Sequence, residues 1–202
     1  RDRVKPLGMR IRKCSTATFA KAARESLAGE VTAFLTPILD TIEEVTRRIR
    51  KMDREIEELA DRKYPETKVL RQIPGVGALT ALAYVLTLEQ PELFRKSRDV
   101  GAFLGLVPRR DQSGESDRQL RITKAGDGFL RRLLVQSAQY ILGPFGEDSD
   151  LRRRGLCRAE RGGKIGKRKS VIATARKLAV LLHSLWRSGE EYEPLRSSAA
   201  VA

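Results

Sequence analysis

The chain has 202 residues, with 40 Lys and Arg against 26 Asp and Glu, which gives a net charge of +14 at pH 7. Hydrophobic residues make up 41% and charged residues 33%, a globular composition rich in helix formers and long enough for one or two domains. No apolar run reaches the roughly 18–20 residues that would span a bilayer. Two cysteines, Cys14 and Cys157, are too few and too far apart for a disulfide framework or a zinc site.

The positive charge is concentrated in one part of the chain. Residues 95–187 hold 22 basic and 9 acidic residues, so this segment carries almost all of the net charge. A segregated basic field attracts polyanions, and phosphates are the usual target. The sequence therefore indicates a nucleic-acid partner, with a merely basic globular protein as the alternative.

The N-terminal quarter predicts a linker, a short helix and a long helix. Residues 1–16 are basic and irregular, and we expect a linker that leads in from a missing upstream domain. Residues 17–28 have the pattern of an amphipathic helix that ends at Gly29. Thr36 and Pro37 suit the N-cap and first position of a helix over about 37–62.

The long helix carries a heptad seam. Its apolar residues recur at alternating spacings of four and three: Ile38, Ile42, Val45, Ile49, Met52, Ile56 and Leu59. Such a stripe must be covered, either by a second protomer or by the 17–28 helix folded back. We favour a dimerisation region over residues 17–63, with an ordinary bundle helix as the alternative.

A second domain is expected over residues 64–187, after the helix-breaking Tyr64-Pro65. No segment shows a strong period of two, so we expect an all-α fold: a long coiled-coil helix followed by a compact helical domain. Residues 188–202 are expected to form a flexible tail. The predicted helices are 66–72, 78–88, 98–105 capped by Ser97, 128–142 capped by Asp127, and 168–187, with loops at 106–125 and 143–163.

The turn Ile73-Pro74-Gly75-Val76-Gly77 between two helices predicts a helix-hairpin-helix motif. Glycines let the backbone approach a phosphate closely, and the helix that follows begins with unpaired N–H groups. We expect the amides of Gly75, Val76 and Gly77 to contact one DNA phosphate without reading sequence. A purely structural turn is the alternative.

The 106–125 loop holds the candidate nucleophile. Ser113 precedes Gly114 in a polar, basic segment. A serine hydroxyl can attack a DNA phosphate if positive charge stabilises the transition state, and arginines match phosphate oxygens. Ser116 is a rival, an ordinary turn is the bland alternative, and no neighbour is an evident general base. The expected phosphate contacts in and around the loop are Arg109, Arg110, Gly114, Arg118, Arg121, Lys124 and Arg131.

Two further basic runs are expected to contact DNA or RNA phosphates, with solvated surface charge as the alternative. They are Arg152, Arg153 and Arg154 with Arg158 and Arg161, and then Lys164, Lys167, Arg168 and Lys169. The single histidine, His183, lies among apolar residues and predicts a core position rather than a ligand or base. We expect no metal site.

The stretch from Ile73 to Ala138, with the run from Lys167 to Trp186, resembles the C-terminal domain of the insertion-sequence transposases that are guided by a bridge RNA. The resemblance covers roughly residues 66–187, and the turn, the serine loop and the closing helix occur in the family's order. It implies that Ser113, in the Gln-Ser-Gly motif, is the nucleophilic serine of a recombinase. It also implies an upstream RuvC-like domain whose acidic cluster binds magnesium, and this chain itself is expected to hold no cofactor.

The same resemblance implies donor and target DNA and a structured guide RNA as partners, a homodimer or homotetramer, and no membrane. Such an enzyme is expected in the bacterial cytoplasm, associated with the nucleoid. Two other functions remain open from the residues alone. One is a non-catalytic helix-hairpin-helix module that only binds DNA, and the other is an assembly element built on the heptad helix.

Overall fold

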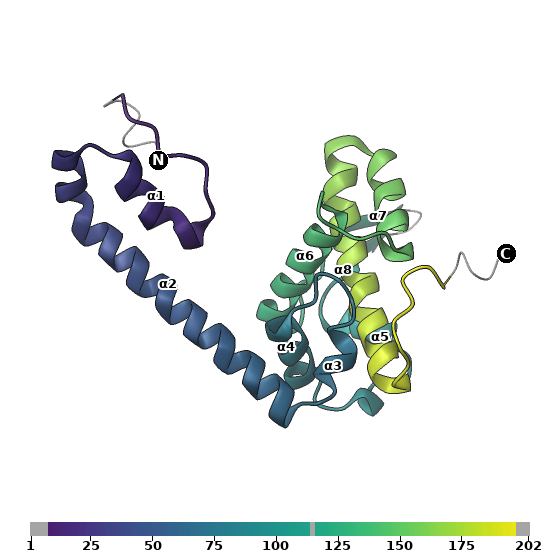
Figure 1. The fold of residues 1–202 in the computed structure, drawn as a ribbon. Helices are drawn as coiled ribbons and strands as arrows, with labels where there is room; N and C mark the ends of the chain where they lie inside the picture. The colour runs from purple at the N-terminus through teal and green to yellow at the C-terminus, as the bar shows by residue number, and fades with distance from the viewer. Residues whose placement is uncertain (1–7, 114–115, 197–202) are drawn as a thin grey trace. The chain divides into compact units, whose positions relative to one another are not determined.

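The computed structural model describes residues 8–113 and 116–196, which divide into two compact units, Arg1–Glu55 and Ile56–Ala202. The boundary between the units lies inside helix α2, Gly29–Lys63 (Figure 1). Within the described ranges, no helix is long and apolar enough to cross a membrane. Helices predominate and the described strands form one two-stranded sheet, which confirms the predicted fold class.

The first unit consists of helix α1, Phe19–Ser26, packed against the N-terminal half of α2. A short 3-10 turn, Thr16–Thr18, precedes α1. Ala20, Ala23 and Leu27 are buried with Leu39 of α2, and Arg24 forms ion pairs with acidic residues of α2. The predicted 17–28 helix is thus confirmed, and it folds back onto the side of α2 that carries Leu35, Leu39 and Ile42.

The predicted start of the long helix at Pro37 is wrong, because α2 begins at Gly29 and runs through the proline. Proline removes one backbone donor from a helix. Next to it, hydroxyls bond to the carbonyls one turn earlier, from Thr36 to Thr32 at 2.8 Å and from Thr41 to Pro37 at 2.8 Å. The helix therefore continues with one backbone bond fewer.

The second unit is a helical domain built around α8, Gly163–Ser188. Helices α3, α5, α6 and α7 all contact α8, and α4 packs on α6 and α3 (Figure 1). The buried Tyr84 of α4 donates its phenol hydrogen to the Ala179 carbonyl of α8 at 2.6 Å, and burial raises the pKa of this phenol. The remaining helices are α3 Thr67–Leu70, α4 Ala78–Leu88, the 3-10 helix Pro91–Leu93, α5 Asp99–Phe103, α6 Gly128–Leu142 and α7 Asp150–Glu160.

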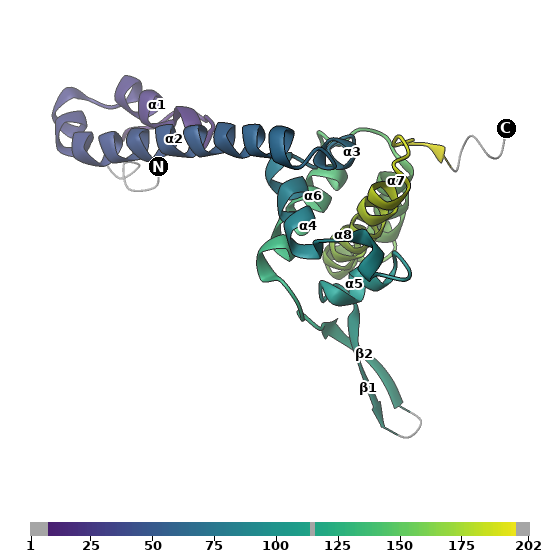
Figure 2. The same cartoon turned by 90° about the horizontal axis from the view of Figure 1, so that it is seen from below.

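The predicted loop at 106–125 is instead a β-hairpin that extends from the helices (Figure 2). Strand β1, Pro108–Ser113, pairs antiparallel with β2, Ser116–Ile122, and the register is irregular between Pro108 and Arg110. All β1 residues are exposed, so there is no buried face to impose an alternating hydrophobic pattern on that strand. This explains why the strand was missed.

The predicted loop at 143–163 is also wrong, because α7 fills most of it. The Ser149 hydroxyl caps α7 by accepting from the Arg152 amide at 3.2 Å. Gly155, which reads as a loop residue, lies where a Cβ would come within 2.5 Å of Leu142 Cδ2 and 2.7 Å of Thr174 Oγ1. The glycine is therefore a packing contact between helices and not a helix breaker.

Two local features of the domain differ from or add to the prediction. Ser97 does not cap α5 with its side chain; its hydroxyl lies 2.9 Å from Nδ1 of the fully buried His183, which confirms the core position of that histidine.

The described part of the segment after α8 lies along the domain. The Tyr192 amide donates to the Gln72 side chain, and the Pro194 carbonyl accepts from the Asp150 amide.

Candidate nucleic-acid interface

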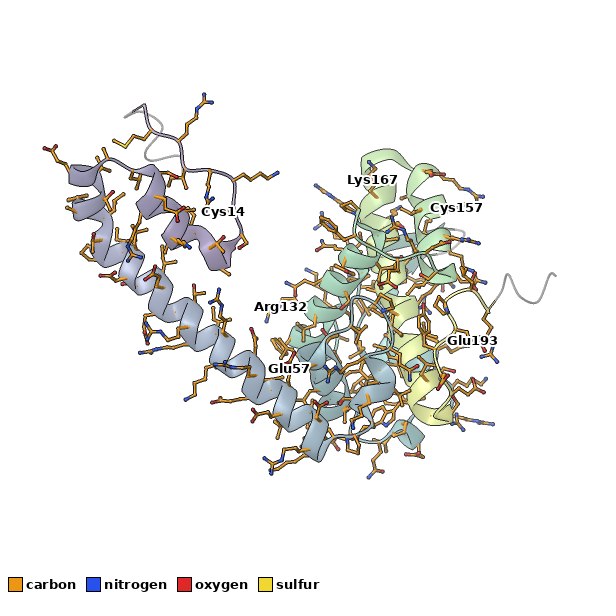
Figure 3. The ribbon with its side chains drawn as sticks, viewed as in Figure 1. Cys14, Glu57, Arg132, Cys157, Lys167 and Glu193 are labelled. Atoms are coloured by element: carbon orange, nitrogen blue, oxygen red, sulfur yellow. The ribbon has the colours of Figure 1, made fainter. Side chains whose placement is uncertain are left out.

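The second unit contains a groove of about 1150 Å³ that is lined by many basic side chains. Its lining comes from Arg98 just before α5, the base of the hairpin, α7, α8 and the segment after α8. Among the described residues, two acidic side chains line it, Asp150 and Glu193, and Figure 3 shows Glu193 on the chain that follows α8. The basic lining residues are Arg98, Arg121, Lys124, Arg154, Arg158, Arg168, Lys169, Arg176, Lys177 and Arg196.

Helix α8 presents a regular stripe of side chains to this groove. Two basic pairs, Arg168-Lys169 and Arg176-Lys177, alternate with two apolar pairs, Ile172-Ala173 and Val180-Leu181. Successive pairs are four residues apart and therefore lie on one face of the helix. The groove thus combines a charged edge with apolar patches along the same wall.

The electrostatics of the groove are those of an anion site. Burial lowers the pKa of the Lys177 ammonium, and the positive charges of Arg154 and Arg158 on α7 lower it further. Arg154 and Arg158 are exposed and one helical turn apart. A phosphate in the groove would offset this mutual repulsion, so the free site favours an anionic ligand.

Ser113 is at the far end of β1, where the strand pairs with Ser116 of β2. The serine is exposed, and in the described part of the chain no side chain hydrogen-bonds its hydroxyl. Arg109 and Arg110 precede it on the same strand and are also exposed. The hydroxyl is accessible to a phosphate, and a general base is not among its described contacts.

The base of the hairpin is held by close backbone packing. A Cβ at Gly105, φ +66, would collide with the backbone of Ala125, and one at Gly126, φ +72, would collide with the Phe103 carbonyl. The Arg131 guanidinium bridges the two ends of the hairpin segment, donating to the Leu104 carbonyl at 3.1 Å and the Ala125 carbonyl at 2.8 Å. The strand that carries Ser113 therefore starts from a fixed base.

The predicted helix-hairpin-helix turn borders a second, shallower hollow between the start of α4 and α6. Gly75 has φ +93, and a Cβ there would come within 2.8 Å of Tyr140. The Val76 amide donates to the Ile73 carbonyl inside the turn, so it is not directed at a ligand. Gly77 is the N-cap of α4 and has no side chain to cap the helix, which leaves the first-turn amides of α4 for a ligand or water.

The structure brings six of the sequence-predicted phosphate contacts together in the basic groove: Arg121, Lys124, Arg154, Arg158, Arg168 and Lys169. Lys167 is exposed at the end of the domain where α7 and α8 meet (Figure 3). Gly114 and the side chains of Arg118 and Lys164 lie outside the described residues.

Three predicted contacts instead make intramolecular bonds. Arg131 bridges the hairpin base. Arg152 donates to the carbonyls of Ile141 and Gly143, and Arg153 pairs with Asp148 at 2.6 Å. The Arg153 guanidinium lowers the pKa of the Asp148 carboxyl by hydrogen bonding. These three guanidinium groups therefore form bonds within the protein.

Sequence reasoning missed Arg98, Arg176, Lys177 and Arg196 as groove residues. Arg98 and Arg196 reach the groove only through tertiary packing. Arg176 and Lys177 could have been found, because they follow Arg168 and Lys169 at the eight-residue spacing that returns to the same helix face. Within the described ranges, no group of three acidic, histidine or cysteine side chains could hold a metal ion.

Residues 67–153 match the model of the transposase IS116/IS110/IS902 family. The chain is 33% identical over 123 residues to the transposase for insertion sequence element IS1111A of Coxiella burnetii, covering 61% of this chain and 33% of that protein. It is 29% identical over 163 residues to a probable family 20 transposase of Pseudomonas aeruginosa, covering 79% and 46%. It is 28% identical over 126 residues to the pilin gene-inverting protein of Moraxella lacunata, covering 62% and 38%. The chain thus spans between a third and a half of the length of these relatives.

Proposed function

We propose that this chain, whose residues 67–153 form a domain of the IS116/IS110/IS902 transposase family, is the part of a DNA transposase that binds DNA and supplies a serine nucleophile. The observation that carries the proposal is the placement of an exposed Ser113 on a hairpin whose base borders the basic groove. A DNA strand held by the groove and the hairpin arginines would bring a phosphate within reach of that hydroxyl.

The proposed step is a transesterification. The Ser113 oxygen forms a bond to a DNA phosphorus, one P–O bond of the backbone breaks, and the serine proton ends on the oxygen that leaves. A second transesterification, by a DNA hydroxyl, releases the serine and joins the new strand. The transition state carries extra negative charge, and we assign its stabilisation to Arg109 and Arg110 of the same strand.

The remaining parts of the reaction are assigned to other components. The described residues include no group of three acidic, histidine or cysteine side chains that could hold a metal ion, and we assign the magnesium that the family resemblance implies to an upstream RuvC-like domain. A structured guide RNA would direct the choice of target, and the enzyme would act in the bacterial cytoplasm. The whole reaction belongs to a longer protein, in keeping with the share of its relatives that this chain spans.

We also propose that α2 provides the oligomer contact. Its seam residues Ile38, Val45, Ile49 and Met52 are between 49% and 58% exposed, whereas Leu39 is buried by α1. An exposed apolar stripe of this length on a long helix is the usual surface for pairing with another helix. A second copy of α2 is the simplest partner.

The experiment is a cleavage and strand-exchange assay in the full-length transposase. Ser113→Ala is expected to abolish both steps while DNA affinity stays within about twofold, because phosphate contacts dominate affinity. Ser116→Ala is the matched control across the hairpin and should remain active. Recombination by Ser113→Ala would refute the nucleophile assignment.

The second candidate function is a non-catalytic module that only binds and assembles on DNA. The open first turn of α4 and the basic groove favour DNA binding without requiring chemistry. If the chain only binds DNA, Ser113→Ala and Ser116→Ala should support recombination equally well when another protein supplies the catalytic subunit. The serine assay therefore separates the two functions.

A further inference from the structure

The alternation of basic and apolar pairs along α8 goes beyond what a duplex-binding surface needs. Arg168-Lys169 and Arg176-Lys177 are separated by eight residues, which is about 12 Å along the helix. Between and beyond them lie Ile172-Ala173 and Val180-Leu181, all partly exposed in the groove. The ligand that fits this wall alternates negative charge with flat apolar groups.

We propose that the groove binds an unpaired nucleic-acid strand, with phosphates on the basic pairs and bases against the apolar pairs. The proposal rests on the proposed function in that the strand would be an unpaired segment of the transposase's own DNA or RNA. Single strands are bound where a positively charged groove follows the backbone and apolar or aromatic surface receives the bases. Leu120 and Ile122 of β2 add apolar surface to the lining of the same groove.

A duplex fits this wall less well than a single strand. Paired bases are stacked inside a duplex, so it offers the protein sugar, phosphate and the base edges in its grooves, but not the flat faces of the bases. Ile172 and Leu181 would then remain without an apolar partner. An unpaired strand can bury its bases against those side chains while keeping the same phosphate contacts.

An amphipathic acidic protein helix is the other ligand class with charge and apolar groups, and it also fits less well. The apolar face of such a helix is continuous along its axis. In this groove it would have to cross Arg176 and Lys177, which interrupt the apolar wall. Because basic residues interrupt the apolar wall at regular intervals, the wall favours a polymer in which each flat group comes with one negative charge, as in an unpaired nucleic-acid strand.

The test compares an oligothymidylate of about 12 nucleotides with a duplex of equal length, by fluorescence anisotropy on the full chain. Ile172→Ser combined with Leu181→Ser should weaken oligothymidylate binding by about tenfold and leave duplex binding within about twofold. Leu86→Ser, at a residue 50% exposed on α4 and absent from the groove lining, is the matched control and should change neither. Arg176→Gln should weaken both ligands and lower the salt slope for the single strand by about 0.7.

A second measurement, on the unmodified chain, tests the proposal even if the double variant fails to fold. In the unmodified chain, oligothymidylate should shield Lys169 and Lys177 from acetylation more strongly than the duplex does. The proposal fails if the apolar variant binds oligothymidylate normally, if the duplex shields these lysines equally, or if polyglutamate displaces the strand at equal charge concentration. Ser113→Ala should bind oligothymidylate normally, so a failure of the serine chemistry and a failure of the groove proposal would be distinguishable.

Discussion

The guanidinium of Arg131 on α6 donates a hydrogen bond to the Ala125 carbonyl at 2.8 Å. The same nitrogen donates to the Leu104 carbonyl, so one side chain joins the chain before the hairpin to the chain after it. From the sequence, Arg131 is predicted to contact a DNA phosphate, because it is basic and lies in the basic segment. In the structure its contacts make it a positioning residue for the strand that carries Ser113.

The first prediction concerns Arg131→Gln. The variant loses two charge-assisted hydrogen bonds in a partly buried site, which should lower the free energy of unfolding by about 1–2 kcal/mol. It should also speed hydrogen exchange at the amides of Thr123 and Lys124, which pair with Val107 and Gly105 across the hairpin base. In the full-length enzyme it should lower the cleavage rate more than the DNA affinity.

The matched control is Arg132→Gln, which removes a charge from the next, exposed residue of α6 (Figure 3). It should leave stability and amide exchange at the hairpin base unchanged. If both variants lowered DNA affinity equally and neither altered exchange, Arg131 would be a phosphate contact after all.

The second prediction concerns Gly126→Ala. The residue has φ +72, and the added Cβ would collide with the Phe103 carbonyl. Left-handed strain together with a backbone clash should cost about 3 kcal/mol or more in thermal or denaturant unfolding. Gly189→Ala is the control, because φ is +68 there but a Cβ meets nothing within 4 Å. It should cost only about 1 kcal/mol, and equal losses at the two sites would show that the clash does not occur.

The third prediction is the pH dependence of single-strand binding. The folded pKa of Lys177 is lowered by burial and by Arg154 and Arg158, and a bound phosphate would raise it. Affinity for the single strand should therefore be full below the pKa of Lys177 in the free groove and fall as the pH rises through that pKa. The loss should begin below pH 10.5, the ordinary lysine value. Lys177→Arg keeps the charge and should reduce this early loss. An unchanged profile in that variant would place the titration elsewhere.

The fourth prediction concerns self-association through α2. Ile49→Asp combined with Met52→Asp places charge on the exposed seam and should weaken oligomers at least tenfold in sedimentation, because buried unpaired carboxylates are costly. Lys51→Asp, at a side chain 73% exposed between them, is the control and should have little effect. Oligomers that survive the seam variant would show that α2 is covered in another way.

Local chemistry made parts of this fold predictable. Asp127 was expected to cap α6, and its carboxylate accepts from the Leu130 amide at 2.5 Å. The helix expected at 78–88 is found at those residues. Both depend on neighbours within one or two helical turns, which periodicity and capping rules describe.

The errors have a common physical origin in tertiary structure. The hairpin depends on pairing between strands, and Gly155 is tolerated in α7 because α8 and Leu142 leave no space for a Cβ. The candidate site was only half predictable for the same reason. Ser113 and the basic runs are visible in the sequence, but the fold decides that Arg154 and Lys177 share a groove while Arg152 and Arg153 bond to the protein itself.

Trapping the protein–DNA intermediate shows which side chain becomes joined to DNA. A suicide DNA substrate, incubated with the full-length transposase and digested with protease, is analysed by mass spectrometry for the peptide that carries a nucleotide. We expect one adduct, a phosphoester on Ser113, that disappears in Ser113→Ala and persists in Ser116→Ala. An adduct on any other side chain, or active recombination with no protein-linked strand, would contradict it.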